Sequence, residues 1–269
     1  MIEAILARAP VFLLLAARCA GLLFTLPLFS MRSVSRVAKI ALIGYMAFFM
    51  MGYAQYGEYA AFLQDDEIFS LYYILLLAGE AMIGVIMGFF VSIIFAVFST
   101  AGQFFAFQMG FSAASAYDAL SQVENPLMGQ FLNFVAMLVF MQTQWFQRLF
   151  LGGLAKSIEA VNAFSLVFAR EAIMGLLLKG LSNLFADALL IALPIMGTLL
   201  LITVCTGLLS KAAPQMNLLS EGFPIMILVS FFVISTVFPS LVDFFERSFS
   251  TGLSNLLYMI TSIGKGGGV

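Results

Sequence analysis

The amino-acid sequence predicts an all-α integral membrane protein built of long helices. Of its 269 residues, 62% are hydrophobic and only 10% are charged, whereas a soluble domain has about 45–50% apolar and about 25% charged residues. The mean hydropathy is +1.07. The apolar runs are long and continuous, unlike the alternating pattern of a membrane β-barrel. Helices, which satisfy their own backbone hydrogen bonds in lipid, are therefore the expected elements.

Two apolar runs, residues 9–29 and 40–53, open the chain. The first carries Arg18 in its middle and is not followed by a small-x-small cleavage site, so we expect a retained membrane segment and not a signal peptide. Between the runs lie the basic residues Arg32, Arg36 and Lys39. This basic cluster favours a cytoplasmic position for the first connection.

The middle of the chain contains an apolar run at 68–107, in which Glu80 is the sole charge. Forty residues rising 1.5 Å each would extend about 60 Å, roughly twice the hydrocarbon thickness. The run is therefore either two helices or one long helix that extends beyond the bilayer. A polar segment rich in small residues follows at 108–130, and then a short apolar run at 131–146.

A long apolar run at 172–209 contains Lys179, Asp187 and Pro194, and the proline is expected to kink the helix. After a polar connection at 210–224, a last span is expected at 225–241. It leads into an amphipathic tail that carries the charged residues Asp243, Glu246 and Arg247.

Several classes of function are excluded by composition. The sequence has no histidine, which removes Ser-His-Asp catalysis and histidine metal sites. The two cysteines, Cys19 and Cys205, form neither a CxxC motif nor a disulfide framework. No glycine-rich phosphate loop occurs, and with a net charge of −2 there is no basic patch for nucleic acid. We expect no enzyme activity, no cofactor and no metal.

Three charges within apolar runs, Glu80, Lys179 and Asp187, are candidate functional residues, because ionisable groups inside a membrane are costly. One interpretation is that they are buried at contacts between subunits, with Gly84 and Gly88 allowing close helix approach beside Glu80. The alternative is a small-molecule secondary transporter that uses all three as an ion or proton pathway. An intramembrane enzyme would need a nucleophile–base pair, which the sequence lacks.

Several motifs resemble the FliR family of flagellar type III export-gate proteins. They are FSMR at 29–32, Gly79-Glu80, QMGFS at 108–112 with Asp118, PLMGQF at 126–131, KAAPQMN at 211–217 and GFP at 222–224. The similarity extends over about residues 8–241, and the KAAPQMN and GFP motifs are its most specific part. On this resemblance the chain is identified as a member of that family.

The resemblance implies a non-enzymatic channel subunit in the bacterial inner membrane, within the flagellar basal body. Such a subunit assembles with FliP and FliQ homologues, contacts membrane lipid and passes unfolded flagellar subunits. Residues 1–170 would be similar to FliP and residues 171–269 to a FliQ hairpin. The resemblance also implies that the helices are tilted and that the protein is stable only as part of the hetero-oligomeric complex.

The segment 108–130 is a candidate plug for the channel, because small residues bordered by bulky apolar side chains could close a pore and still move aside. Met109, Phe111 and Tyr117 are the expected plug residues, and Asp118 is the expected tether. The alternatives are an ordinary loop, or a segment that packs against FliP and never meets the pore.

The connection at 210–224 is a candidate partner-docking turn between two antiparallel helices on the cytoplasmic side. Pro214 and Pro224 are expected to bracket and stiffen it. Polar contacts are expected from Lys211, Gln215 and Asn217. The resemblance implies that its partner is an FlhB homologue.

Overall fold

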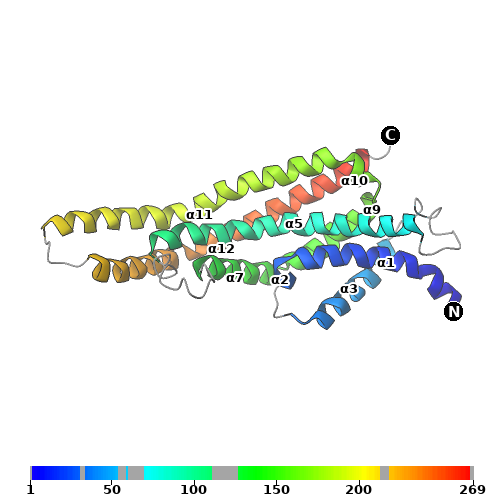
Figure 1. Cartoon of the computed structure of the whole chain (residues 1–269), viewed down its shortest axis with the longest axis horizontal. Helices are drawn as coiled ribbons and strands as arrows, with labels where there is room; N and C mark the ends of the chain where they lie inside the picture. Colours follow the sequence, from blue (N-terminus) through cyan, green and yellow to red (C-terminus); the bar gives the residue numbers. More distant parts are fainter. Residues whose placement is uncertain are drawn as a thin grey trace. The chain divides into compact units, whose positions relative to one another are not determined.

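The computed structural model describes residues 2–30, 34–53, 59, 70–110, 127–212 and 218–266, and these residues form helices and turns without a β-strand. The short elements are α2 (Pro27–Ser30), η1 (Met51–Tyr53), α8 (Trp145–Arg148), a π-helix (Leu149–Leu154), α9 (Ala155–Ala160) and α10 (Ser165–Phe168). The longer ones are α1 (Ile2–Thr25), α3 (Arg36–Met50), α5 (Leu71–Gln108), α7 (Leu127–Gln142), α11 (Arg170–Ala212) and α12 (Leu218–Gly266). The predicted all-α fold is confirmed (Figure 1).

Three helices are longer than a bilayer is thick. α5, α11 and α12 have 38, 43 and 49 residues, which correspond to about 57, 65 and 74 Å at 1.5 Å per residue. The run at 68–107 is therefore one long helix and not two. The expected last span and its amphipathic tail are likewise one helix, α12, because the tail continues the helical period without a break.

This continuity corrects the predicted connection between the last two helices. α11 ends at Ala212 and α12 begins at Leu218, so Pro224 lies inside α12 and does not bracket a turn. Membrane helices tolerate an internal proline because neighbouring groups satisfy the carbonyl that it leaves free.

Four helices in the described part of the chain are long and apolar enough to cross a membrane. They are Arg36–Tyr53, Leu71–Gln108, Arg170–Ala212 and Pro224–Ile263. In the most apolar 18-residue stretch of each helix, the fraction of residues buried inside the chain is 22%, 56%, 28% and 17%, respectively. Most of the apolar surface of α3, α11 and α12 is thus left for lipid or for other proteins.

The chain divides into two compact units. Unit 1 comprises residues 1–93, 144–180 and 250–269, and unit 2 comprises residues 94–143 and 181–249. Each of the three longest helices contributes one part to each unit. These units do not correspond to the predicted division into a FliP-like part, residues 1–170, and a FliQ-like part, residues 171–269. That division rests on sequence resemblance and stays a prediction.

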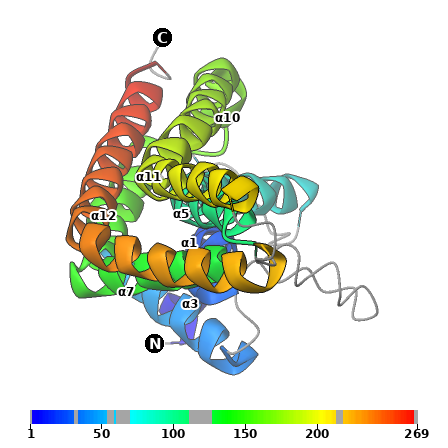
Figure 2. The ribbon, with the colours of Figure 1, turned by 90° about the vertical axis from the view of Figure 1, so that its left-hand side faces the viewer.

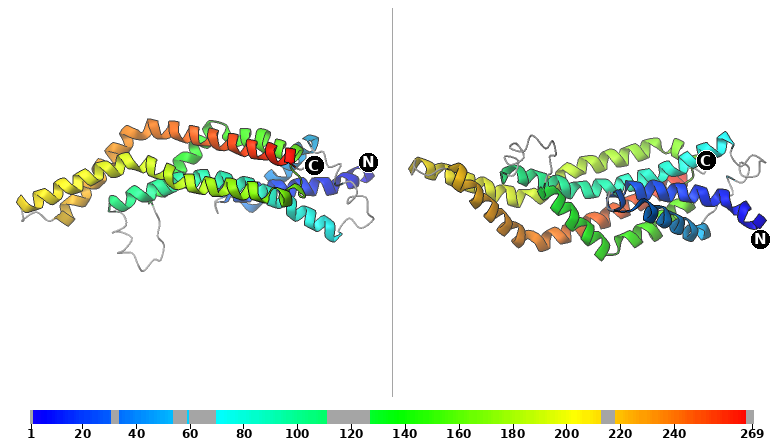
Figure 3. Two further views of the ribbon diagram at one scale, coloured as in Figure 1. Left: turned by 90° about the horizontal axis from the view of Figure 1, so that it is seen from above. Right: turned by 60° about the horizontal axis from the view of Figure 1, so that its bottom comes forward.

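In unit 1, α1 packs against both α3 and α5 (Figure 3). Ser35 begins α3, since its side chain accepts a hydrogen bond from the Ala38 backbone N–H at 3.2 Å. Three glycines, Gly21, Gly84 and Gly88, line the contact of α1 with α5, and a methyl group on any of them would overlap atoms of the facing helix. The expected close approach beside Glu80 is confirmed, and it is made within this chain.

Unit 2 has an aromatic core to which three helices contribute. Phe95 and Phe98 of α5 meet Phe249 of α12, with ring centroids 5.0 and 6.0 Å apart. Phe140 of α7 lies 5.1 Å from Phe249, and Phe245 of α12 packs edge-on against Phe98. Figure 2 shows the ribbons of α5, α7 and α12. These contacts occupy one face of α12 and leave its opposite face unpacked.

Candidate functional site

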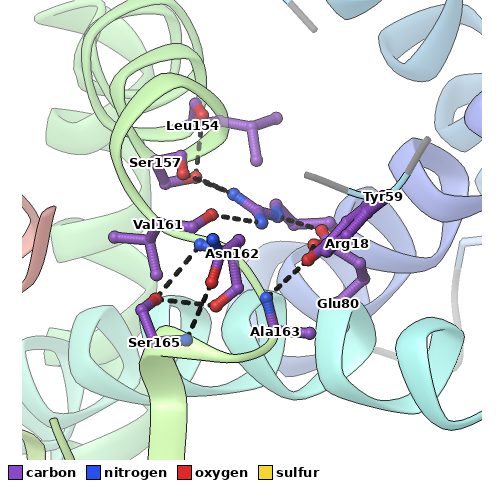
Figure 4. A network of polar contacts seen from close by, with 9 residues as sticks. All are labelled: Arg18, Tyr59, Glu80, Leu154, Ser157, Val161, Asn162, Ala163 and Ser165. Carbon is purple, nitrogen blue, oxygen red and sulfur yellow. Dashed lines mark hydrogen bonds and ion pairs between the residues drawn. The ribbon is translucent and has the colours of Figure 1, made fainter. Parts of the chain in front are cut away.

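One ion pair forms among the described residues, and it lies between two apolar helices of unit 1. Nε of Arg18, on α1, lies 2.6 Å from Oε2 of Glu80, on α5, and both side chains have an exposed fraction of 0% (Figure 4). The residues are the single charges of their apolar runs. A buried charge is tolerated when it is paired and its remaining groups are hydrogen-bonded.

The other guanidinium nitrogens of Arg18 bind the turn that ends α9. Nη1 donates to the Ser157 carbonyl oxygen at 2.5 Å and to its Oγ at 3.2 Å, and Nη2 donates to the Val161 carbonyl oxygen at 2.7 Å. Carbonyls at a helix C-terminus carry partial negative charge and have room for a second donor; that of Ser157 also accepts the Val161 N–H. Arg18 therefore caps α9 while it neutralises Glu80.

The second carboxylate oxygen of Glu80 accepts a hydrogen bond from the Tyr59 hydroxyl at 2.8 Å. The same hydroxyl accepts one from the Ala163 backbone N–H at 2.5 Å. Burial raises the pKa of Tyr59, and the Glu80 carboxylate raises it further, so the phenol stays protonated and can donate. We call Arg18, Tyr59, Glu80, Ser157, Val161 and Ala163 the Arg18 network.

The Arg18 network joins four parts of the chain that are distant in sequence: α1, residue 59, α5 and the turn between α9 and α10 (Figure 4). Next to it, the Ser165 N–H donates to Asn162 Oδ1 at 2.8 Å and fixes the start of α10. The network can hold helices in register. It does not present a free acid, because both oxygens of Glu80 are bonded and its side chain is buried.

The predicted intramembrane charges do not form one site. Glu80 finds its partners within the chain, and neither Lys179 nor Asp187 takes part in the Arg18 network. Lys179, on α11 in unit 1, is exposed, and Asp187, on α11 in unit 2, is half-buried. In the described part of the chain, no group of three Cys, Asp or Glu residues could hold a metal ion.

The predicted plug and docking residues are described only in part. Met109 lies just after α5 and is fully buried in unit 2, and Gly110 follows it with a φ of 85°. Lys211 lies exposed in the last turn of α11. The remaining predicted residues lie outside the described residues: Phe111, Tyr117, Asp118, Pro214, Gln215 and Asn217.

Arg18, Tyr59 and Ser157 are the residues that sequence reasoning missed. A signal existed for Arg18, because two apolar runs each contain a lone charge and the charges are opposite. Pairing them removes the cost of two isolated ions at once. No comparable signal marked Tyr59 or Ser157, since a tyrosine or serine in a connection is common.

Removing only the Tyr59 hydroxyl should loosen the Arg18 network. In Tyr59→Phe, one oxygen of Glu80 and the Ala163 N–H lose their partner, and we expect a loss of about 1–3 kcal/mol in stability. The measurement is the temperature at which the detergent-solubilised protein aggregates. Tyr258→Phe is the matched control, because that side chain is 76% exposed. Equal aggregation temperatures for the two variants would contradict the assigned role of Tyr59.

Comparison with known proteins identifies the family. Residues 9–252 match the family described as bacterial export proteins, family 1. The flagellar biosynthetic protein FliR of Borreliella burgdorferi is 35% identical over 187 residues, which is 69% of this chain and 70% of that protein. FliR of Bacillus subtilis is 29% identical over 93% of this chain and 96% of that protein. The surface presentation of antigens protein SpaR of Shigella flexneri is 30% identical over 66% of this chain and 70% of that protein. The chain therefore belongs to the bacterial export proteins, family 1, the family of FliR.

Proposed function

We propose that this chain is a non-enzymatic channel subunit of the flagellar type III export gate in the bacterial inner membrane. It assembles with FliP and FliQ homologues, and the complex passes unfolded flagellar subunits across the membrane. Residues 1–170 take the place of a FliP-like subunit and residues 171–269 that of a FliQ-like hairpin. Its FliR relatives are flagellar biosynthetic proteins, which supports a role in the flagellar process.

The observation that carries the proposal is the unburied apolar surface of the membrane-length helices. In the most apolar 18-residue stretch of each helix, only 28% of the α11 residues and 17% of the α12 residues are buried inside the chain. Exposed leucine and phenylalanine side chains, such as Leu201 (66%) and Phe232 (71%), lie on both helices. Large apolar faces of this kind mark contacts with lipid or with other subunits. A subunit of a larger membrane assembly explains them.

The second candidate, a small-molecule secondary transporter, is not favoured by the geometry. A carrier needs a carboxylate that faces a cavity and can exchange its partner. Glu80 has an exposed fraction of 0%, an ion pair and a second hydrogen bond, and Lys179 and Asp187 lie outside its network.

Co-production tests the proposal. We expect the full chain to be recovered in a stable complex when it is produced with the FliP and FliQ homologues of its own organism, and to form no stable oligomer and a lower yield when it is produced alone. Deleting its gene should abolish motility, and the intact gene should restore it. Recovery of a stable homo-oligomer that transports a small ion would favour the transporter instead.

We further propose that the segment 108–130 closes the idle channel, with Phe111 and Tyr117 as the plug, Asp118 as its tether, and the predicted plug residue Met109 buried in unit 2 at the base of the segment. Support comes from Gly110, whose φ of 85° favours glycine and redirects the chain directly after α5. We expect deletion of residues 111–116 from the assembled complex to increase ion leakage at rest, because water is no longer excluded. Electrical conductance of the complex in a planar bilayer measures this. An unchanged conductance in an intact assembly would mean that the segment only packs against FliP.

The connection between α11 and α12 is proposed to dock an FlhB homologue on the cytoplasmic side through Lys211, Pro214, Gln215 and Asn217. The exposed position of Lys211 supports an accessible turn. A photo-reactive cross-linker attached to a cysteine at Gln215 should therefore give an adduct with FlhB. A cysteine at the buried Ser230 is the control. Labelling of the Gln215 cysteine from the periplasmic side alone would contradict this placement.

A further inference from the structure

One face of α12 in unit 2 differs from the other exposed helix faces. After Phe232, the exposed residues of α12 recur every three to four positions and are mainly polar. They are Ser235, Thr236, Pro239, Ser240, Asp243, Glu246 and Arg247. We call this set the α12 polar stripe. The side chains on the opposite face are buried and apolar, among them Ile234, Leu241 and Phe245.

Within unit 2, most of the exposed side chains of α11 are apolar, although Ser182, Asn183, Thr203 and Lys211 are exposed as well. Its large exposed apolar side chains are leucine, phenylalanine and valine, such as Leu193, Leu201 and Val204. The first turns of α12 also expose apolar groups, Leu228 and Phe232. These faces suit lipid. The α12 polar stripe does not suit lipid, because it carries the charged residues Asp243, Glu246 and Arg247.

The charges on the stripe exclude hydrocarbon as its surroundings. Asp243, Glu246 and Arg247 are exposed, and none of them forms an ion pair among the described residues. Charged side chains within membrane-length helices face protein or a water-filled cavity, because lipid does not solvate them. Aspartate, glutamate and serine are also depleted in the cores of protein–protein interfaces. Water is therefore the medium that fits the stripe.

In unit 1 the last part of α12 shows a polar exposed face as well. The exposed residues there include Ser250, Thr251, Ser254, Asn255, Thr261 and Ser262, together with the aromatic Tyr258. The hydroxyl groups of Ser254 and Thr261 donate to carbonyl oxygens of their own helix, at 2.8 and 2.9 Å. Such groups need no fixed partner outside the helix.

We propose that the α12 polar stripe lines the aqueous channel, facing the unfolded polypeptide during export; this rests on the proposed channel function. Its side chains fit a moving, extended chain of varied sequence. Hydroxyl groups and charges of both signs offer exchangeable hydrogen bonds, and the stripe in unit 2 contains no aromatic or large aliphatic side chain to which an apolar segment would adhere. The buried aromatic face of α12, with Phe245 and Phe249, holds the helix in place behind it.

Cysteine accessibility in the assembled complex tests the proposal. Ser235→Cys and Ser240→Cys place thiols on the stripe with minimal change in volume, in a background where the native Cys205 is replaced by alanine. The probe is a negatively charged, membrane-impermeant methanethiosulfonate reagent. Two controls are matched: Ser230→Cys on the buried face of α12, and Cys205 itself on the exposed face of α11.

We expect both stripe cysteines to react at least about tenfold faster than either control, because a thiol ionises in water and much less in apolar surroundings. An export substrate stalled in the channel by a folded domain fused to its end should suppress that reaction several-fold. It should leave the controls unchanged.

Two results would overturn the proposal. Stripe cysteines that react as slowly as Cys205 in a complex that still exports would show that lipid or a partner covers the stripe. Fast reaction without protection by the stalled substrate would place the stripe in water outside the channel. Failure of the proposed function would look different, since no stable complex with FliP and FliQ homologues would form and export would not depend on this chain.

Discussion

Replacing Glu80 by alanine should destabilise the protein by about 3–5 kcal/mol, because it removes the carboxylate that pairs with the buried guanidinium of Arg18. The Tyr59 hydroxyl loses its acceptor in the same step. We expect the variant to fall to a small fraction of the normal level in membranes and to lose motility. Immunoblots of the membrane fraction and swimming in soft agar measure these effects.

Two further variants separate the effect of losing the Glu80 charge from the effect of losing its side-chain packing. Glu159→Ala is the control, because it removes an exposed carboxylate from α9, close to the network in sequence. The double variant Arg18→Met with Glu80→Met should recover most of the lost stability, since replacing both members of a buried pair by apolar groups is often close to neutral. If the double variant is as unstable as the sum of the single variants, the pair is not coupled and the interpretation is wrong.

Replacing Gly84 by valine should separate α1 from α5 and cost at least about 1–3 kcal/mol, the usual penalty of overpacking. Even one added carbon at Gly84 would overlap the carbonyl oxygen of Arg18, and valine adds three. The change therefore also displaces the backbone that carries the network arginine. We expect a lower aggregation temperature and weaker recovery with partner subunits, measured by fluorescence-detected gel filtration.

Gly44 provides the matched control on α3, because nothing lies within 4 Å of a methyl group built there. Gly44→Ala should be neutral or slightly stabilising, since alanine is favoured over glycine in a helix interior by about 1 kcal/mol. Tolerance of Gly84→Val at the level of Gly44→Ala would show that the α1–α5 contact is looser than the structure indicates.

Composition determined that this is an all-α membrane protein, and the lack of histidine excluded histidine chemistry. The first property depends on the summed hydrophobicity of the chain, which tertiary contacts do not change. The lone charges Arg18 and Glu80 were visible in the sequence as well. The motifs around residues 211–217 were sufficient for the family, which the comparison with known proteins confirms.

The tertiary structure alone decided where those features meet. Whether the run at 68–107 forms one helix or two depends on what packs along it, and Glu80 gained its partners from α1 and residue 59, 62 and 21 positions away. Sequence cannot encode such pairings locally, because the cost of burying a charge is relieved by whichever opposite group the fold brings near. For the same reason, only the packed aromatic face of α12 revealed that Ser235 and Asp243 lie on the exposed face of that helix.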